Sequence, residues 1–157
     1  MNTALSKSRF KQGLECPNKL YFSNNSEDYH NVKKYDTFLQ ALASGGFQIE
    51  EYARLQYPEG ILIEDPEDRK DYDYQDLADQ TTALLQQENV VIFEAAFYID
   101  DLFIRTDLLV KKGNQIKLIE VKAKSIDPRK EDNFLTKKKR KIVSGWKPYL
   151  FDLAFQN

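Results

Sequence analysis

Residues 90–124 read VVIFEAAFYIDDLFIRTDLLVKKGNQIKLIEVKAK, and this stretch decides the fold. It contains three runs rich in β-branched and aromatic residues, which predict three strands, at 90–99, 102–111 and 115–124. Two short turns, Asp100-Asp101 and then Gly113-Asn114, connect the runs, and such two-residue connections indicate tight hairpins. We therefore expect a three-stranded antiparallel meander.

The two turns bring three carboxylates into one row of the expected sheet. Counting back from the second turn places Asp107 opposite Glu120, and counting back from the first places Glu94 opposite Asp107. Directly opposed side chains project from the same face, where like charges destabilise a sheet. A hard divalent cation such as Mg²⁺ would compensate them, because carboxylates are its usual protein ligands. Lys122, two residues beyond Glu120, is expected on the same face.

The same row has a plainer interpretation. Antiparallel sheets often expose one face to solvent, and the carboxylates could form an acidic stripe there. Lys122 and Arg105 would then be ordinary surface partners of these acids. Only the first interpretation predicts that the row binds a metal ion.

The residues of the row also match a known motif. Asp107, twelve intervening residues and then Glu120-Val121-Lys122 resemble the PD-(D/E)XK pattern of metal-dependent nucleases. The pattern is most similar to that of the RecB-like branch, in which a glutamate on a strand precedes the aspartate. Glu94 holds the corresponding position in this chain. Flanking segments also resemble RecB-like nucleases, at 5–22, 45–60 and 147–156. The chain as a whole resembles the N-terminal part of an uncharacterised bacterial family of RecB-like nucleases.

The resemblance implies a fold and an activity. The fold would be an α/β (α+β) restriction-endonuclease-like core in a single domain, 1–157, with helices at 47–56 and 147–156 packed on the meander. The chain is expected to be truncated before the last core strand, so that the fragment itself could be inactive. The activity would be hydrolysis of DNA phosphodiester bonds with Mg²⁺ or Mn²⁺, in DNA repair or defence.

The resemblance also assigns roles to individual residues. Asp107 and Glu120 would be metal ligands, joined by the backbone carbonyl of Val121. Lys122 would orient the attacking water or stabilise the extra negative charge of the transition state. Glu94 is a ligand, a carboxylate that acts through a bridging water, or a residue of the sheet face, and the bridging role is the preferred interpretation.

Further residues are placed by the resemblance around this centre. Glu50 falls where many RecB-like enzymes carry a histidine, with Glu51 as an equal rival and a plain helix-surface role as the alternative. Gln156 falls at the glutamine of a Gln-x-x-x-Tyr motif. Cys16 corresponds to the first of four cysteines that hold an iron–sulfur cluster in some relatives, but as the only cysteine it cannot complete one in this chain. His30 is the only histidine, which argues against a zinc site.

Composition limits the class of protein and its partners. The 157 residues have a net charge of −2 and are 41% hydrophobic, values typical of a folded domain. No run of about 20 apolar residues predicts a membrane span and no signal peptide is evident, so we expect a cytoplasmic protein. Positively charged residues are concentrated near the row in the sequence, and the expected partner is therefore nucleic acid, with DNA favoured over RNA. The residues expected to bind it are Lys137, Lys138, Lys139, Arg140 and Lys141. The alternative for these five is a solvated loop.

A second functional class stays open at this point. The chain could be a catalytically inactive nuclease-like module that binds nucleic acid or a protein partner. It could also be a small interaction domain on which the carboxylates are ordinary surface residues. Metal binding separates the last possibility from the others, and a nuclease assay separates an enzyme from a binding module.

Overall fold

A computed structural model describes residues 4–25, 27–65, 73–130, 133–138 and 140–156. At its centre is a five-stranded mixed sheet in the order β1-β4-β3-β2, with β5 also paired to β4. The strands are β1 (Leu5–Ser6), β2 (Ile61–Leu62), β3 (Asn89–Ile99), β4 (Leu102–Lys112) and β5 (Gln115–Ile119). The predicted strands β3, β4 and β5 pair antiparallel, but the prediction that they alone form the sheet is wrong, because β1 and β2 extend it in the parallel sense.

Both predicted turns form, and both set the predicted register. Ile99 pairs with Leu102 across the first turn, where Asp100 and Asp101 have φ of +49° and +61°. Positive φ at both central residues is the conformation of the tight turns that favour Asn, Asp and Gly. At the second turn Lys112 pairs with Gln115. The third strand is shorter than predicted, since β5 ends at Ile119 rather than near 124.

Two layers of apolar side chains cover the sheet. On one face, α4 (Tyr74–Leu84) buries Leu77 against a cluster that includes Ile92 and Leu109. Thr81 of the same helix accepts a hydrogen bond from the backbone N–H of Ala96 at 2.8 Å, which fixes α4 on β3. A second cluster contains four buried side chains, with Ala53 and Tyr57 packed against it: Val91, Phe93, Leu108 and Val110.

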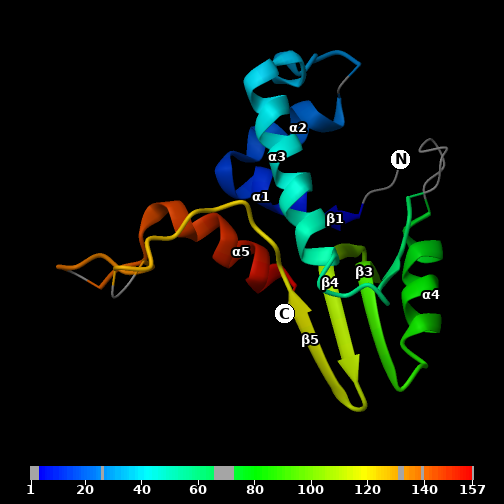
Figure 1. The fold of residues 1–157 in the computed structure, drawn as a ribbon. Helices are drawn as coiled ribbons and strands as arrows, with labels where there is room; N and C mark the ends of the chain where they lie inside the picture. Colours follow the sequence, from blue (N-terminus) through cyan, green and yellow to red (C-terminus); the bar gives the residue numbers. More distant parts are fainter. Residues whose placement is uncertain (1–3, 26, 66–72, 131–132, 139, 157) are drawn as a thin grey trace.

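The remaining helices form a separate group beside the sheet (Figure 1). They are α1 (Lys7–Glu15), α2 (Pro17–Asn24), α3 (Thr37–Arg54) and α5 (Lys147–Phe155), with 3-10 turns at Val32–Tyr35 and Ser144–Trp146. Two adjacent glycines, Gly45 and Gly46, predict from the sequence that a helix ends before residue 47, yet α3 continues through both from its cap at Asp36. Most of α3 stands away from the sheet, and its C-terminal end supplies Ala53 to the second cluster.

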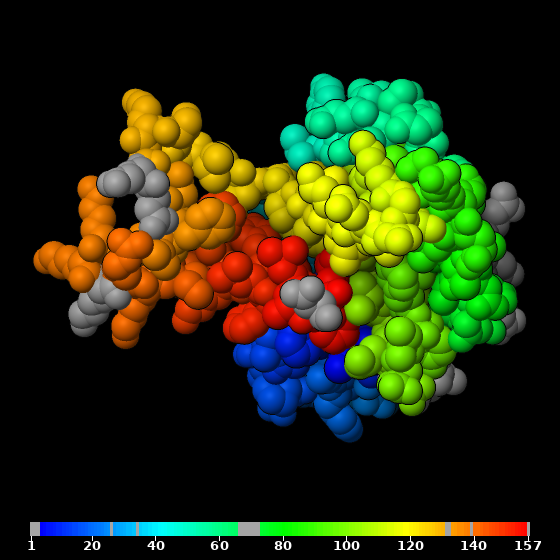
Figure 2. All heavy atoms as spheres, turned by 90° about the horizontal axis from the view of Figure 1, so that it is seen from below, coloured from blue at the N-terminus to red at the C-terminus, as the bar shows by residue number. Residues whose placement is uncertain are grey.

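Helix α5 docks on α1 rather than on the sheet. The rings of Phe10 and Phe155 stack with centroids 4.9 Å apart, while Phe151 and Leu153 are exposed. Figure 2 shows α5 filling the space between β5 and α1. None of the described helices has the length and apolar character that crossing a membrane requires.

The described residues among 123–143, namely 123–130, 133–138 and 140–143, are here named the arm, and they lead away from the sheet after β5 and back to α5. The arm packs on the 3-10 turn before α5, where the Phe134 and Trp146 rings lie 4.4 Å apart and Trp146 Nε1 donates a hydrogen bond to the Asn133 carbonyl. In both views the tip of the arm projects from the body of the molecule (Figures 1 and 2). The arm therefore takes the chain away from the sheet and returns it to α5, which docks on α1.

Candidate active site

The candidate site lies where one edge of β4 loses its partner strands. β1 pairs with β4 at Leu102 and Phe103, and β5 pairs with the same edge from Leu108 onwards. Lys7 directly follows β1 and Glu120 directly follows β5, so the two residues meet across the unpaired part of this edge. The Lys7 ammonium contacts both Glu120 carboxylate oxygens, at 2.8 and 3.1 Å.

Glu120 is the most heavily hydrogen-bonded carboxylate of the site. Its side chain is 6% exposed, and besides Lys7 it accepts hydrogen bonds from Lys122 at 2.5 Å and from Gln156 Nε2 at 2.7 Å. Burial alone would raise the pKa of Glu120, but the hydrogen bonds from Gln156, Lys122 and Lys7 outweigh burial and lower it below its ordinary value. Glu120 is therefore held as a carboxylate. Gln156, assigned to the site from its motif position, contacts it directly.

The Lys122 ammonium is surrounded by three oxygens of other groups. It lies 2.5 Å from Glu120 Oε1, 3.5 Å from Asp107 Oδ2 and 2.9 Å from the Val121 carbonyl. Burial lowers the pKa of Lys122, but the hydrogen bond with Glu120 and the negative charges of Asp107, Glu120 and Asp152 outweigh burial and raise it. One cation therefore occupies the point that the Asp107, Glu120 and Val121 oxygens share.

Asp107 also explains why β5 ends early. Its Oδ2 accepts a hydrogen bond from the Val121 backbone N–H at 2.6 Å. A backbone donor that would otherwise continue the ladder is thus satisfied by a side chain, and the chain turns off the sheet. The same contact fixes the Asp107 carboxylate beside the Val121 peptide. We name Lys7, Asp107, Glu120, Lys122 and Gln156 the carboxylate–lysine cluster.

Glu94 lies in a distorted part of β3. The register on both sides places it opposite Asp107, as predicted, but these two residues do not pair and Glu94 has φ of +57°. A left-handed conformation costs a non-glycine residue about 1 kcal/mol or more. Its carboxylate contacts Arg54 at 3.0 Å and Arg105 at 3.5 Å. Burial raises the pKa of Glu94, the charges of Arg105 and Arg54 oppose the rise, and the charge of Asp107 adds to it.

Glu50 and Glu51 have different surroundings. Burial raises the pKa of Glu50, and the negative charges of Asp107 and Glu94 raise it further. Glu51 is an exposed residue with a long contact of 3.4 Å to Arg54. Of the two candidates, Glu50 is thus the one whose charge interacts with the site.

The predicted basic segment lies elsewhere. Lys137, Lys138, Arg140 and Lys141 are exposed residues of the arm, away from the carboxylate–lysine cluster, and Lys139 lies outside the described residues (Figure 1). Closeness in sequence to Glu120 does not become closeness in space, because the arm carries the segment outwards. Cys16 is a half-buried free cysteine at the start of α2, and His30 is an exposed loop residue.

Sequence reasoning missed several charged residues of the site. Arg54 has no signal of its own in the sequence, and Lys7 lies in the 5–22 segment with no role assigned to it. A lysine at the first position of a helix is disfavoured by the helix dipole, and this could have indicated a nearby carboxylate. Asp152 is 1% exposed, bonds Lys11 at 3.1 Å and leaves Oδ1 without a hydrogen-bond partner among the described residues. It lies four residues before Gln156, on the same face of α5.

The donor atoms at the cluster suit a hard divalent cation. In the described parts of the chain, no three or more His, Cys, Asp or Glu side chains come together as a metal-binding group. Two carboxylates and one backbone carbonyl nevertheless converge on a single cation, the Lys122 ammonium. Carboxylate and carbonyl oxygens in that number are what Mg²⁺ takes from proteins, with water completing its shell. The residues therefore fit Mg²⁺ or Mn²⁺, provided that the ammonium shifts.

Comparisons with known proteins gave no match: no family model, no curated protein and no solved structure matches the chain. The geometry of the cluster is therefore the observation that indicates a function.

Proposed function

We propose that this chain is a metal-dependent nuclease domain of the PD-(D/E)XK type, related to RecB-like enzymes, that hydrolyses DNA phosphodiester bonds. One observation carries the proposal: oxygens of Asp107, Glu120 and Val121 all contact the Lys122 ammonium. These are the groups that the motif assigns to the metal and to its lysine. A restriction-endonuclease-like arrangement of the sheet and a place in DNA repair or defence belong to the same proposal.

Each residue of the cluster has a role in this proposal. Asp107, Glu120 and the Val121 carbonyl would hold Mg²⁺ or Mn²⁺, which lowers the pKa of a coordinated water and polarises the scissile phosphate. Lys122 would leave the Val121 carbonyl to orient the attacking water or to stabilise the charge that the phosphate gains. Lys7 and Gln156 hold the Glu120 carboxylate in position.

Calorimetric titration with Mn²⁺ is the first test. The parent chain should bind Mn²⁺, and Asp107→Asn should lose most of that binding. Asp127→Asn is the matched control, because Asp127 lies in the arm and pairs with Arg129. Cleavage of labelled single-stranded and duplex DNA, with EDTA as the negative control, then tests catalysis. A parent chain that binds no Mn²⁺, or two variants that lose it equally, would refute the proposal.

A second candidate function is a catalytically inactive nuclease-like module that binds nucleic acid or a protein. The observation that favours it is charge compensation within the chain, since Glu120 already has Lys7 and Lys122 as partners and Glu94 has Arg54. Such a cluster is stable without a metal. It would bind nucleic acid in EDTA but leave DNA uncut in Mg²⁺ and Mn²⁺.

A further inference from the structure

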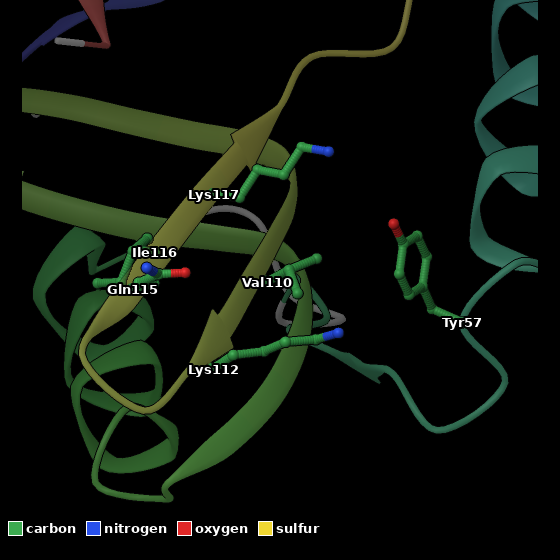
Figure 3. A pocket seen from close by; sticks show the side chains of 6 residues that line it. All are labelled: Tyr57, Val110, Lys112, Gln115, Ile116 and Lys117. Carbon is green, nitrogen blue, oxygen red and sulfur yellow. The ribbon is translucent and has the colours of Figure 1, made fainter.

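A groove of about 480 Å³ lies at the turn end of the β4–β5 hairpin, opposite Tyr57 (Figure 3). Figure 3 shows the Tyr57 ring facing the hairpin across this space, with the Lys112 and Lys117 side chains extending towards the same side. We name it the turn-end groove, and its lining residues are Tyr57, Val110, Lys112, Gln115, Ile116 and Lys117. None of them belongs to the carboxylate–lysine cluster. Its volume is in the range of small-ligand sites.

The Tyr57 wall of the groove is fixed by packing. Tyr57 lies against the buried cluster that includes Phe93 and Val110. A turn follows it, in which the Gly60 N–H donates to the Tyr57 carbonyl at 2.9 Å. Gly60 is required there, because a Cβ atom at this position would lie 2.2 Å from the Phe93 ring. The Tyr57 ring is thus held beside the hairpin before any ligand arrives.

The opposite wall carries two lysines on one face of the hairpin. Lys112 pairs with Gln115 and Val110 pairs with Lys117, so the two lysines are diagonal neighbours. Within the described residues neither lysine forms an ion pair. Lys111 on the same strand differs, because its ammonium is bound by the Leu85 and Gln87 carbonyls at 2.5 and 2.8 Å. Lys112 and Lys117 are therefore two uncompensated cations next to an aromatic ring.

We propose that the turn-end groove binds single-stranded nucleic acid, with one base stacked on Tyr57 and backbone phosphates on Lys112 and Lys117. The choice of nucleic acid rests on the proposed function. Stacking on a protein ring needs an unpaired base, so the groove should prefer single strands over duplex. Lys117 is three residues before Glu120, about 10 Å along an extended chain. The groove therefore lies at the other end of the hairpin from the carboxylate–lysine cluster.

Fluorescence anisotropy with labelled oligothymidylate of about 15 nucleotides tests this in EDTA, where no cleavage can occur. The double variant Lys112→Gln/Lys117→Gln should weaken binding about tenfold and reduce the salt slope by about 0.7 for each phosphate that is no longer neutralised. Tyr57→Leu should also weaken binding about tenfold, because it removes the ring but keeps an apolar side chain.

Two variants serve as matched controls. Tyr57→Phe keeps the ring and should bind like the parent, which separates stacking from any fault in folding. Lys33→Gln removes one charge from an exposed residue outside the groove and should change affinity less than twofold. Thermal unfolding curves of all variants should superimpose, except for a lower midpoint in Tyr57→Leu.

Several results would overturn the proposal. They are no binding of oligothymidylate by the parent, equal loss of affinity in Lys33→Gln and the double variant, or equal affinity for a duplex of the same length. Polyglutamate is the probe for an acidic peptide site, and if it binds as tightly with the same variant pattern, the groove is not a nucleic-acid site.

Failure of the nuclease proposal gives a different pattern. Asp107→Asn should lose Mn²⁺ binding and cleavage while keeping the parent's affinity for oligothymidylate in EDTA. If the parent binds no Mn²⁺ but the groove variants still bind oligothymidylate more weakly, the nuclease proposal fails and the groove assignment stands. If Mn²⁺ binding is intact and the groove variants bind like the parent, only the groove assignment fails.

Discussion

The two ends of the β4–β5 hairpin carry the same kind of charge in different surroundings. At the open end, Lys122 contacts Glu120 and Asp107, and Lys7 contacts Glu120 from the neighbouring helix. At the turn end, Lys112 and Lys117 have no ion pair within the described residues. One end is a compensated, half-buried cluster, and the other presents free cations to solvent.

The difference shows which charges shape the fold and which are available to a ligand. Removing one member of a half-buried cluster leaves its partners uncompensated and costs stability. Removing an exposed, unpaired lysine costs almost none, because water solvates it in any case. Substitutions at the open end should therefore affect stability and chemistry together, whereas those at the turn end should affect binding alone.

The largest expected effect is the loss of DNA cleavage when Lys122 at the open end is replaced. This substitution distinguishes the role of the lysine from that of the metal ligands. Lys122→Met should reduce DNA cleavage about a hundredfold or more, because a positive charge near the transition state is removed. The same change should leave Mn²⁺ binding intact or tighter, since the ammonium that shares its three oxygens is gone. Asp107→Asn should lose both properties. Single-turnover cleavage and calorimetry measure the two separately.

The outcome of Lys122→Met decides between the two candidate functions. A Lys122→Met variant that cleaves DNA as fast as the parent would refute the nuclease proposal. A parent that does not cleave, with Mn²⁺ bound equally by the parent and Lys122→Met, would favour the inactive binding module instead.

The next effect concerns stability at the same end. Glu120→Ala should lower the free energy of unfolding by about 2 kcal/mol, because the Lys7 and Lys122 ammonium groups lose their shared partner. Glu15→Ala is the matched control, since Glu15 pairs with Lys19 at the surface of α1, and it should change stability by less than about 0.5 kcal/mol. Urea denaturation measures both. Equal losses of stability would mean that the cluster is as well solvated as a surface pair.

The sequence alone predicted the hairpins and the register of the row. Asp100-Asp101 and Gly113-Asn114 determine the turns, and the period of two along a strand then brings Asp107 to Glu120. It could not predict β1, which is two residues long and pairs only because the tertiary fold presents a strand edge to it. The role of Lys7 depends on β1 and was missed for the same reason.

Local rules also failed where tertiary contacts outweigh them. Gly45-Gly46 predicted a helix end, yet α3 continues through both residues from the Asp36 cap. The basic residues 137–141 were predicted to lie beside the site, but the path of the arm, which no local pattern specifies, takes the described ones away from it. The distortion at Glu94 is likewise invisible in the sequence, because a glutamate is an unusual residue for positive φ.

The third prediction concerns the arm, and the expected change in affinity for single-stranded DNA is about tenfold. Replacing the described basic residues of its tip, Lys137, Lys138, Arg140 and Lys141, by Gln should weaken binding to single-stranded DNA and flatten its salt dependence by about 0.7 for each phosphate that the arm no longer neutralises. Mn²⁺ affinity should not change, because the arm tip lies away from the cluster. Titration by anisotropy at several salt concentrations measures the slope. An unchanged slope would mean that these cations only solvate the arm.

The smallest expected effect is a change in the pH dependence of stability. It follows from the opposite pKa shifts of two carboxylates at the open end, Glu120 and Glu94. The pKa of Glu120 is lowered, so its stabilising contribution is complete above its ordinary value of 4.5 and is lost as the pH falls through its folded-state pKa. The pKa of Glu94 is raised, chiefly by burial, so its contribution is complete below 4.5 and is lost as the pH rises through its folded-state pKa. The two groups thus act on stability with opposite sign.

Glu94→Gln should therefore raise the free energy of unfolding slightly at pH 7 and leave it nearly unchanged below about pH 4. The physical reason is that Gln imitates the protonated form, which the buried site prefers despite the contacts of Glu94 with Arg54 and Arg105. Glu120→Gln should do the reverse, with a loss of stability at pH 7 that shrinks as the pH falls. Urea denaturation at the two pH values measures both variants. A loss of stability at pH 7 in Glu94→Gln would show that its two arginine contacts outweigh burial, so that Glu94 belongs with the compensated charges that hold the open end together.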